Sequence, residues 1–176
     1  GASKAAGGML ALEVGQAMAV PTTVLRLFNV YGPHEAEHRL AAALMHALSK
    51  GQKVALSAGT QARDFIYIDD VCEGMWRMLQ GMLSGHVASG AYNLATGQAT
   101  RVADFARLVA RHMQLPETLL DFGALPLRAD DAPYMVGDNT QLQQCLQWKP
   151  LWGVEAGIRA IVQTAVDNLP AQIEIA

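Results

Sequence analysis

The chain has 176 residues, enough for one ordinary domain or for a large part of a bigger protein. Hydrophobic residues make up 51% of it and charged residues 16%, a composition that fits a folded globular protein and excludes an intrinsically disordered one. The formal net charge of −3 provides no basic surface for nucleic acid or an anionic membrane, and no apolar run is long enough to span a bilayer.

The first two predicted elements are a helix and a strand. Residues 3–20 are rich in Ala, Leu and Met and predict a helix that ends before Pro21, and the glycine pair at positions 7 and 8 indicates close packing against another element. Residues 22–30 (TTVLRLFNV) are β-rich and nearly continuously apolar, the pattern of a strand covered on both faces in a parallel sheet. Residues 31–33 (YGP) end this strand.

Further helices and strands alternate along the rest of the chain. We expect helices at residues 36–50, 69–82, 102–113, 139–146 and 154–169. We expect strands at residues 53–58, 65–68, 91–94 and 119–122, and irregular structure at 126–138. Asp69 or Asp70 is expected to cap its helix. This alternation predicts an α/β protein.

Only the strand at residues 22–30 has the pattern of full burial, so a parallel sheet would lack most of its strands. We expect the missing strands upstream of Gly1, which itself stands inside a helical pattern. The sequence is therefore interpreted as the later part of a longer protein.

Lys4 is the first candidate for chemistry because it stands at the start of the first predicted helix. A side chain four positions earlier would lie on the same face of that helix. If that side chain were a tyrosine, the lysine ammonium would favour the phenolate and lower the pKa of the phenol, giving a base near neutral pH. The alternative, a solvated surface lysine, is the more common one for an isolated Ser-Lys pair.

Three later segments combine predicted strand or turn residues with polar side chains: residues 25–33 (LRLFNVYGP), 63–71 (RDFIYIDDV) and 123–131 (GALPLRADD). The amide of Asn29 can both donate and accept hydrogen bonds at the end of a strand. The planar guanidinium groups of Arg63 and Arg128 can donate two parallel hydrogen bonds to an oxyanion. The alternatives are a buried strand followed by a turn and, for Arg63-Asp64, a surface ion pair.

Together with Lys4, these segments resemble the motifs of the NAD-dependent epimerases and dehydratases, extended short-chain dehydrogenases/reductases that modify nucleotide sugars. Lys4 would complete the family's Tyr-x-x-x-Lys, with the tyrosine one position before Gly1, and the other motifs occur in the family's order. The family has Tyr, Pro and Glu at the positions of Leu127, Ala129 and Asp131. The resemblance therefore does not determine the shape of the nucleotide pocket.

The resemblance implies a role for each of these residues. Lys4 would be catalytic and would also hold the nicotinamide ribose, and Phe28 would lie beside the nicotinamide. Asn29, Arg63 and Arg128 would bind the nucleotide-diphosphate sugar.

The implied fold is the last part of a Rossmann sheet with a small α/β substrate-binding domain. The cofactor domain would keep residues 1–31 and 64–83. The sugar-binding region would comprise residues 32–63 and 84–176, with part of it returning to the Rossmann domain.

The implied reaction is oxidation of the sugar at C4 by hydride transfer to NAD or NADP, followed by epimerisation, dehydration or reduction. These 176 residues contain no Gly-x-Gly-x-x-Gly, so the chain is expected to be inactive alone and to bind no cofactor by itself. A cytoplasmic homo-oligomer is expected, because the first helix and strand would expose apolar surface. The alternative is a non-catalytic nucleotide-sugar-binding or self-assembling module.

Metal sites are not expected. Cys72 and Cys145 have no metal-ligand spacing and form no disulfide framework. Residues 34–38 (HEAEH) match the zinc motif His-Glu-x-x-His, but that site needs both histidines on one face of a helix and a third ligand. The preceding YGP turn argues against such a helix.

Overall fold

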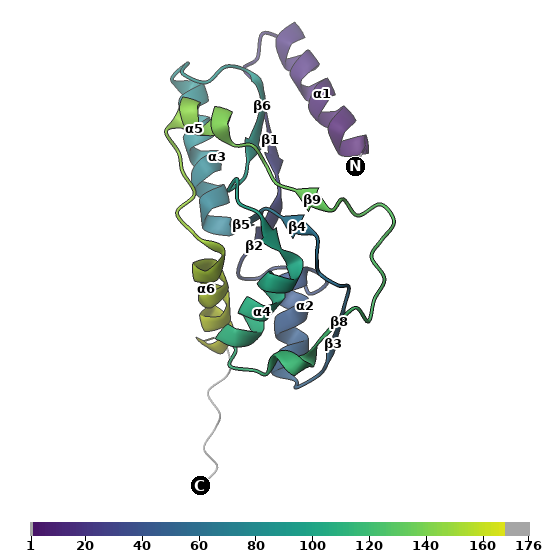
Figure 1. The fold of residues 1–176 in the computed structure, drawn as a ribbon. Coiled ribbons are helices and arrows are strands. Elements are labelled where there is room, and N and C mark those ends of the chain that lie inside the picture. The colour runs from purple at the N-terminus through teal and green to yellow at the C-terminus, as the bar shows by residue number, and fades with distance from the viewer. Residues whose placement is uncertain (1, 168–176) are drawn as a thin grey trace. The chain divides into compact units, whose positions relative to one another are not determined.

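The computed structural model describes residues 2–167 (Figure 1). The chain forms two compact units, each assembled from three separate segments. Unit 1 comprises Gly1–Val30, Arg63–Ala99 and Tyr134–Leu151. Unit 2 comprises Tyr31–Ala62, Thr100–Pro133 and Trp152–Ala176. Residues 84–99 and 134–151 thus group with the first strand of the chain.

Unit 1 is a parallel strand pair with helices. Its elements are α1 (Ala2–Ala17), β1 (Thr23–Leu27), β5 (Phe65–Tyr67), α3 (Ile68–Leu83), β6 (Gly90–Leu94) and α5 (Thr140–Leu146). Figure 1 shows β1 beside β6, and the two pair in parallel from Thr23 opposite Gly90 to Leu27 opposite Leu94. Gly74 lets α3 lie close to this pair, because a Cβ there would be 2.5 Å from Leu94 Cδ1.

The core of unit 1 lies between α3, α5 and β6. It is built from the buried side chains of Ile66, Val71, Met78, Val87, Tyr92, Leu94, Leu142 and Trp148. Val71 and Met78 are seven positions apart on α3 and therefore share one helical face. This apolar face explains why the helix forms where the sequence pattern predicts it.

Unit 2 is a second α/β arrangement. Its elements are α2 (Leu40–Ser49), β3 (Val54–Leu56), α4 (Val102–His112), the 3-10 turn η1 (Glu117–Leu119), β8 (Leu120–Phe122) and α6 (Val154–Asp167). The strands β3 and β8 pair in parallel, with Val54 opposite Leu120. Helix α4 packs against α2 and α6, and its buried Phe105 and Val109 join the core.

Four short strands lie where the chain passes from one unit to the other. They are β2 (Asn29–Tyr31), β4 (Ala62–Arg63), β7 (Thr100–Arg101) and β9 (Tyr134–Met135). Of these, β4, β7 and β9 were not predicted as strands, because two residues carry too little pattern to be read.

The prediction of an α/β protein is confirmed, but the strand predicted at residues 22–30 is not continuous. It breaks at Phe28, and Leu27 is 48% exposed, in line with the expectation that this strand exposes apolar surface. Among the described residues β1 pairs only with β6. No helix within residues 2–167 is long and apolar enough to cross a membrane.

Three helix boundaries also differ from prediction, the first being the start of α2, which lies at Leu40 instead of residue 36. Helix α1 ends at Ala17, three residues early, because Ala19 adopts a positive φ of 54° and Val20 N bonds back to Gly15 O at 2.8 Å. Helix α3 begins at Ile68 with Tyr67 as its N-cap, so neither Asp69 nor Asp70 is the cap.

Both aspartates instead lie in the first turn of α3, where negative charge complements the helix dipole. Asp70 is buried, and its Oδ1 accepts a hydrogen bond from Leu151 N at 2.8 Å. It therefore links the start of α3 to the last segment of unit 1.

Candidate functional site

Asp64 is the centre of a buried polar cluster in unit 1, with an exposed fraction of 0%. Its Oδ1 accepts hydrogen bonds from Thr96 N at 2.9 Å and from Thr96 Oγ1 at 2.7 Å. Its Oδ2 accepts hydrogen bonds from Gly97 N at 2.9 Å and from Gly137 N at 3.2 Å. Four donors replace the water that a buried carboxylate loses. Asp64 thus connects two loops that are distant in sequence, at residues 96–97 and at residue 137, to the start of β5.

Three of the predicted site residues surround this cluster. Asn29 donates to Asp64 O from its backbone N at 2.9 Å and from its side-chain Nδ2 at 3.3 Å. The ring of Phe28 lies against Gly137, where an added Cβ would be 2.7 Å from the ring carbons. Arg63 is only 7% exposed, which excludes the surface ion pair considered for Arg63-Asp64.

Lys4 lies at a separate cavity of unit 1, between α1 and β1. The cavity has a volume of about 530 Å³, and residues 24–27 of β1 form its other wall. Gly8 brings the helix close to the strand, because a Cβ there would be 3.2 Å from Val24 Cγ1. The predicted close packing of the glycine pair is thus confirmed for Gly8, whereas Gly7 faces open space. Lys4 and Arg26 are the charged residues of this cavity.

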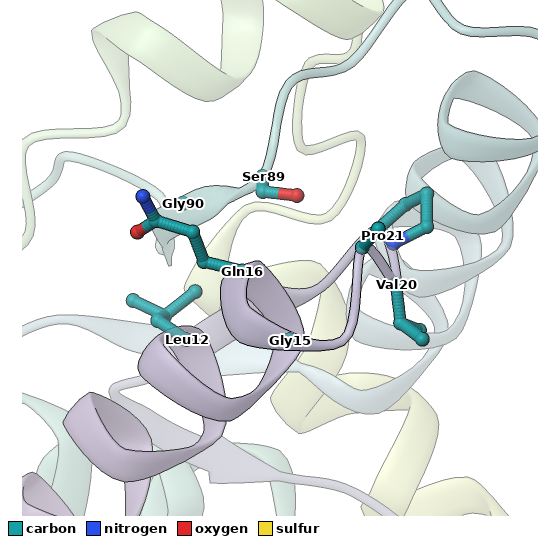
Figure 2. Close-up of a pocket in the computed structure, with 8 residues that line it drawn as sticks. Leu12, Gly15, Gln16, Val20, Pro21, Ser89 and Gly90 are labelled. Carbon is teal, nitrogen blue, oxygen red and sulfur yellow. The ribbon is translucent and has the colours of Figure 1, made fainter.

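A second cavity of unit 1 lies under the last turns of α1 and has a volume of about 510 Å³ (Figure 2). Gln16 and Ser89 are its polar side chains, and no ionisable residue lines it. Ser89 Oγ already accepts a hydrogen bond from Thr22 N at 3.0 Å. This lining offers no acid or base that could activate the Ser89 hydroxyl, and none of the predicted site residues lies here.

Arg128 lines a cavity within unit 2 that has a volume of about 280 Å³. The loop that carries it is fastened to β3, because Leu56 O accepts hydrogen bonds from both Gly123 N and Leu125 N at 3.0 Å. Asp131 N also bonds to Arg128 O at 3.1 Å and closes a turn. Arg128 therefore lies at the wall of the cavity, on a loop that backbone hydrogen bonds hold in place.

Residues 34–38 do not form the helix that a His-Glu-x-x-His zinc site needs. Helix α2 begins only at Leu40, and His34 has a positive φ of 61°. Glu35 Oε1 instead accepts a hydrogen bond from Arg39 Nε at 3.0 Å, and burial raises the pKa of the Glu35 carboxyl above its usual value. No group of three or more His, Cys, Asp or Glu side chains suited to a metal occurs within residues 2–167.

Two polar residues of these sites were not found by sequence reasoning. Asp64 was read only as a partner of Arg63, although its donors come from residues 96, 97 and 137. Gln61, which lines the Arg128 cavity, belongs to no motif. The sequence has one weak signal for the first of these, a Thr-Gly pair after the strand at 91–94.

Comparison with known proteins points to one family. The profile of the NAD dependent epimerase/dehydratase family matches residues 1–95, more than half of the chain. The dTDP-L-rhamnose 4-epimerase of Burkholderia thailandensis is 32% identical over 163 residues, which are 90% of this chain and 43% of that protein. The chain spans about half the length of the curated relatives it matches.

Solved structures share the fold. The UDP-glucose 4-epimerase of Thermus thermophilus in complex with NAD has a TM-score of 0.82 and 26% identity, covering 96% of this chain and 54% of that one. The UDP-glucose 4-epimerase of Thermotoga maritima with UDP-glucose has a TM-score of 0.86 and 23% identity, covering 97% of this chain and 54% of that one. The predicted fold, part of an extended short-chain dehydrogenase/reductase, is confirmed.

Proposed function

This chain belongs to the NAD dependent epimerase/dehydratase family, and we propose that it supplies the active-site lysine and the sugar-nucleotide contacts of an enzyme that oxidises a nucleoside-diphosphate sugar at C4. The relatives support this class of substrate. One is named for a dTDP-sugar, and two solved neighbours are UDP-glucose 4-epimerases. After oxidation, the 4-keto sugar is epimerised, dehydrated or reduced.

The observation that carries the proposal is the placement of Lys4 on the cavity between α1 and β1. Leu25 and Leu27 make much of the strand wall apolar, while Lys4 provides an ammonium donor. Such a lining fits the contact between a lysine and the ribose of a nicotinamide cofactor. When bound, the nicotinamide supplies the acceptor for the hydride that leaves C4.

The other residues act on the substrate. Lys4 lowers the pKa of a phenol one helical turn before it, and that phenolate takes the proton of the C4 hydroxyl. Asn29 bonds the sugar nucleotide, and its Oδ1 accepts no hydrogen bond from the described residues. Arg63 and Arg128 would neutralise the pyrophosphate, and Phe28 would contact the nicotinamide.

Replacing Lys4 by methionine in the full-length protein tests this role. We expect kcat to fall about tenfold to a hundredfold, because the phenol loses the neighbouring charge. The substrate in this assay is whichever dTDP- or UDP-sugar the wild-type protein turns over. The pH profile of kcat/KM should shift its rising limb to higher pH. Lys53→Met, at an exposed position in unit 2, is the matched control. An unchanged rate and pH profile in Lys4→Met would refute the role of Lys4.

The 176 residues on their own are proposed to turn over no nucleotide sugar and to bind no NAD. They contain no Gly-x-Gly-x-x-Gly for the cofactor pyrophosphate. An assay of the purified chain with dTDP- and UDP-sugars checks this, and turnover would contradict it. Nucleotide-sugar binding without turnover by the full-length protein would favour the alternative, a binding module, and light scattering would show whether copies self-associate.

A further inference from the structure

The backbone of Asp64 is bonded as fully as its carboxylate. Asp64 N donates to Met135 O at 3.1 Å, and Asp64 O accepts hydrogen bonds from Asn29 N at 2.9 Å and from Asn29 Nδ2 at 3.3 Å. The carboxylate oxygens accept from residues 96, 97 and 137. Every polar atom of Asp64 therefore bonds to another segment of unit 1.

The ring of Phe28 depends on this arrangement through Gly137. The segment at residues 135–137 is held by Asp64 at two points, the bond to Met135 O and the bond from Gly137 N. An added Cβ on Gly137 would be 2.7 Å from Cε2 and Cζ of Phe28, so the ring lies directly on the backbone there. A shift of residue 137 therefore changes the surface against which the Phe28 ring packs.

The amide of Asn29 is held by the same residue. Its backbone N and its side-chain Nδ2 both donate to one acceptor, the carbonyl oxygen of Asp64. Because Asp64 is 0% exposed, no water can replace a partner that its carboxylate loses. A change of that carboxylate is therefore taken up by movement of the segments bonded to it.

We propose that Asp64 is a positioning residue for the reaction, whose hydrogen bonds set the places of the Phe28 ring and of the Asn29 amide. Asp64 is fully buried and so touches neither substrate nor cofactor itself. This inference rests on the proposed function, in which Phe28 contacts the nicotinamide and Asn29 binds the sugar nucleotide. Displacing either one misaligns C4 with the hydride acceptor, and a misplacement of about 1 Å can lower a rate about a hundredfold.

The test compares Asp64→Asn with Asp70→Asn in the full-length protein, because both change a buried aspartate of unit 1. The Asp70 carboxylate accepts from Leu151 N, outside the proposed site. Each kcat is divided by the fraction of folded molecules, measured by tryptophan fluorescence. We expect kcat per folded molecule to fall about tenfold to a hundredfold in Asp64→Asn and to stay within about twofold of wild type in Asp70→Asn.

Thr96→Val is a milder second variant. It removes the hydroxyl that donates to Asp64 Oδ1 but keeps the charge of Asp64 and the shape of the side chain. We expect kcat per folded molecule to fall about threefold. Thr23→Val removes a hydroxyl that donates to Met82 Sδ in the same unit and should behave as wild type. Thr96→Val decides the matter if Asp64→Asn is too unstable to assay.

The possible results separate this inference from the proposed function. If the wild-type protein turns over no nucleotide sugar, both fail. If the wild type is active and Asp64→Asn and Thr96→Val keep its kcat per folded molecule, only the positioning role is overturned. Equal losses in Asp64→Asn and Asp70→Asn would also overturn it, because general loosening of unit 1 would then account for both.

Discussion

Asp64→Asn is expected to lower the free energy of unfolding by about 3–5 kcal/mol. The asparagine keeps one acceptor oxygen, but its NH₂ group must face either the two donors of Thr96 or the N–H groups of Gly97 and Gly137. If it faces Thr96, the Thr96 N–H loses its acceptor and the hydroxyl must turn to accept instead; if it faces the glycines, two N–H donors lose theirs. In either case the charge that strengthens all four hydrogen bonds is removed.

Urea unfolding followed by tryptophan fluorescence measures this change, because Trp148 is buried in the core of the same unit. Asp121→Asn is the matched control, since Asp121 is exposed and its substitution should cost less than about 0.5 kcal/mol. If the two variants unfold at the same urea concentration, the Asp64 cluster does not stabilise unit 1.

Gly59→Ala is expected to cost about 2–5 kcal/mol in unit 2. Gly59 has a positive φ of 66°, and strain there costs an L-residue about 1–2 kcal/mol. An added Cβ would also lie 2.8 Å from the backbone N of Ala103, at the start of α4. Overpacking of this kind costs about 1–3 kcal/mol more, because the backbone of the helix must move.

Gly51→Ala separates the two causes. Gly51 has a nearly identical φ of 65°, but nothing lies within 4 Å of its added Cβ. Its substitution should therefore cost only the strain, about 1–2 kcal/mol. Urea unfolding of both variants checks the difference, and equal losses would show that the contact with Ala103 is unimportant.

The longer elements could be predicted from sequence because a local pattern determines them. Helix α4 was expected at residues 102–113 and lies at Val102–His112, since its apolar residues repeat with the helical period. The break at Phe28 and the late start of α2 were missed. The first accompanies a bond between distant segments, from Asn29 N to Asp64 O, and the second follows a backbone turn at His34, where φ is positive.

The candidate site was only partly accessible to sequence reasoning. Arg128 and Lys4 could be singled out because they belong to motifs, and each lines a cavity. The importance of Asp64 depends on donors 32 to 73 residues away. The cavity that Arg128 lines is made by segments that no single stretch of sequence contains.

The repeated passage of the chain between its units limits how such a protein can change. The chain passes from one unit to the other after residues 30, 62, 99, 133 and 151, so each unit is built from three segments. Recombination between genes at one or two points cannot exchange a whole unit for that of a relative. A hybrid made in this way would join mismatched halves of both cores. New specificity is therefore expected to arise by point substitution at cavity walls rather than by exchange of modules.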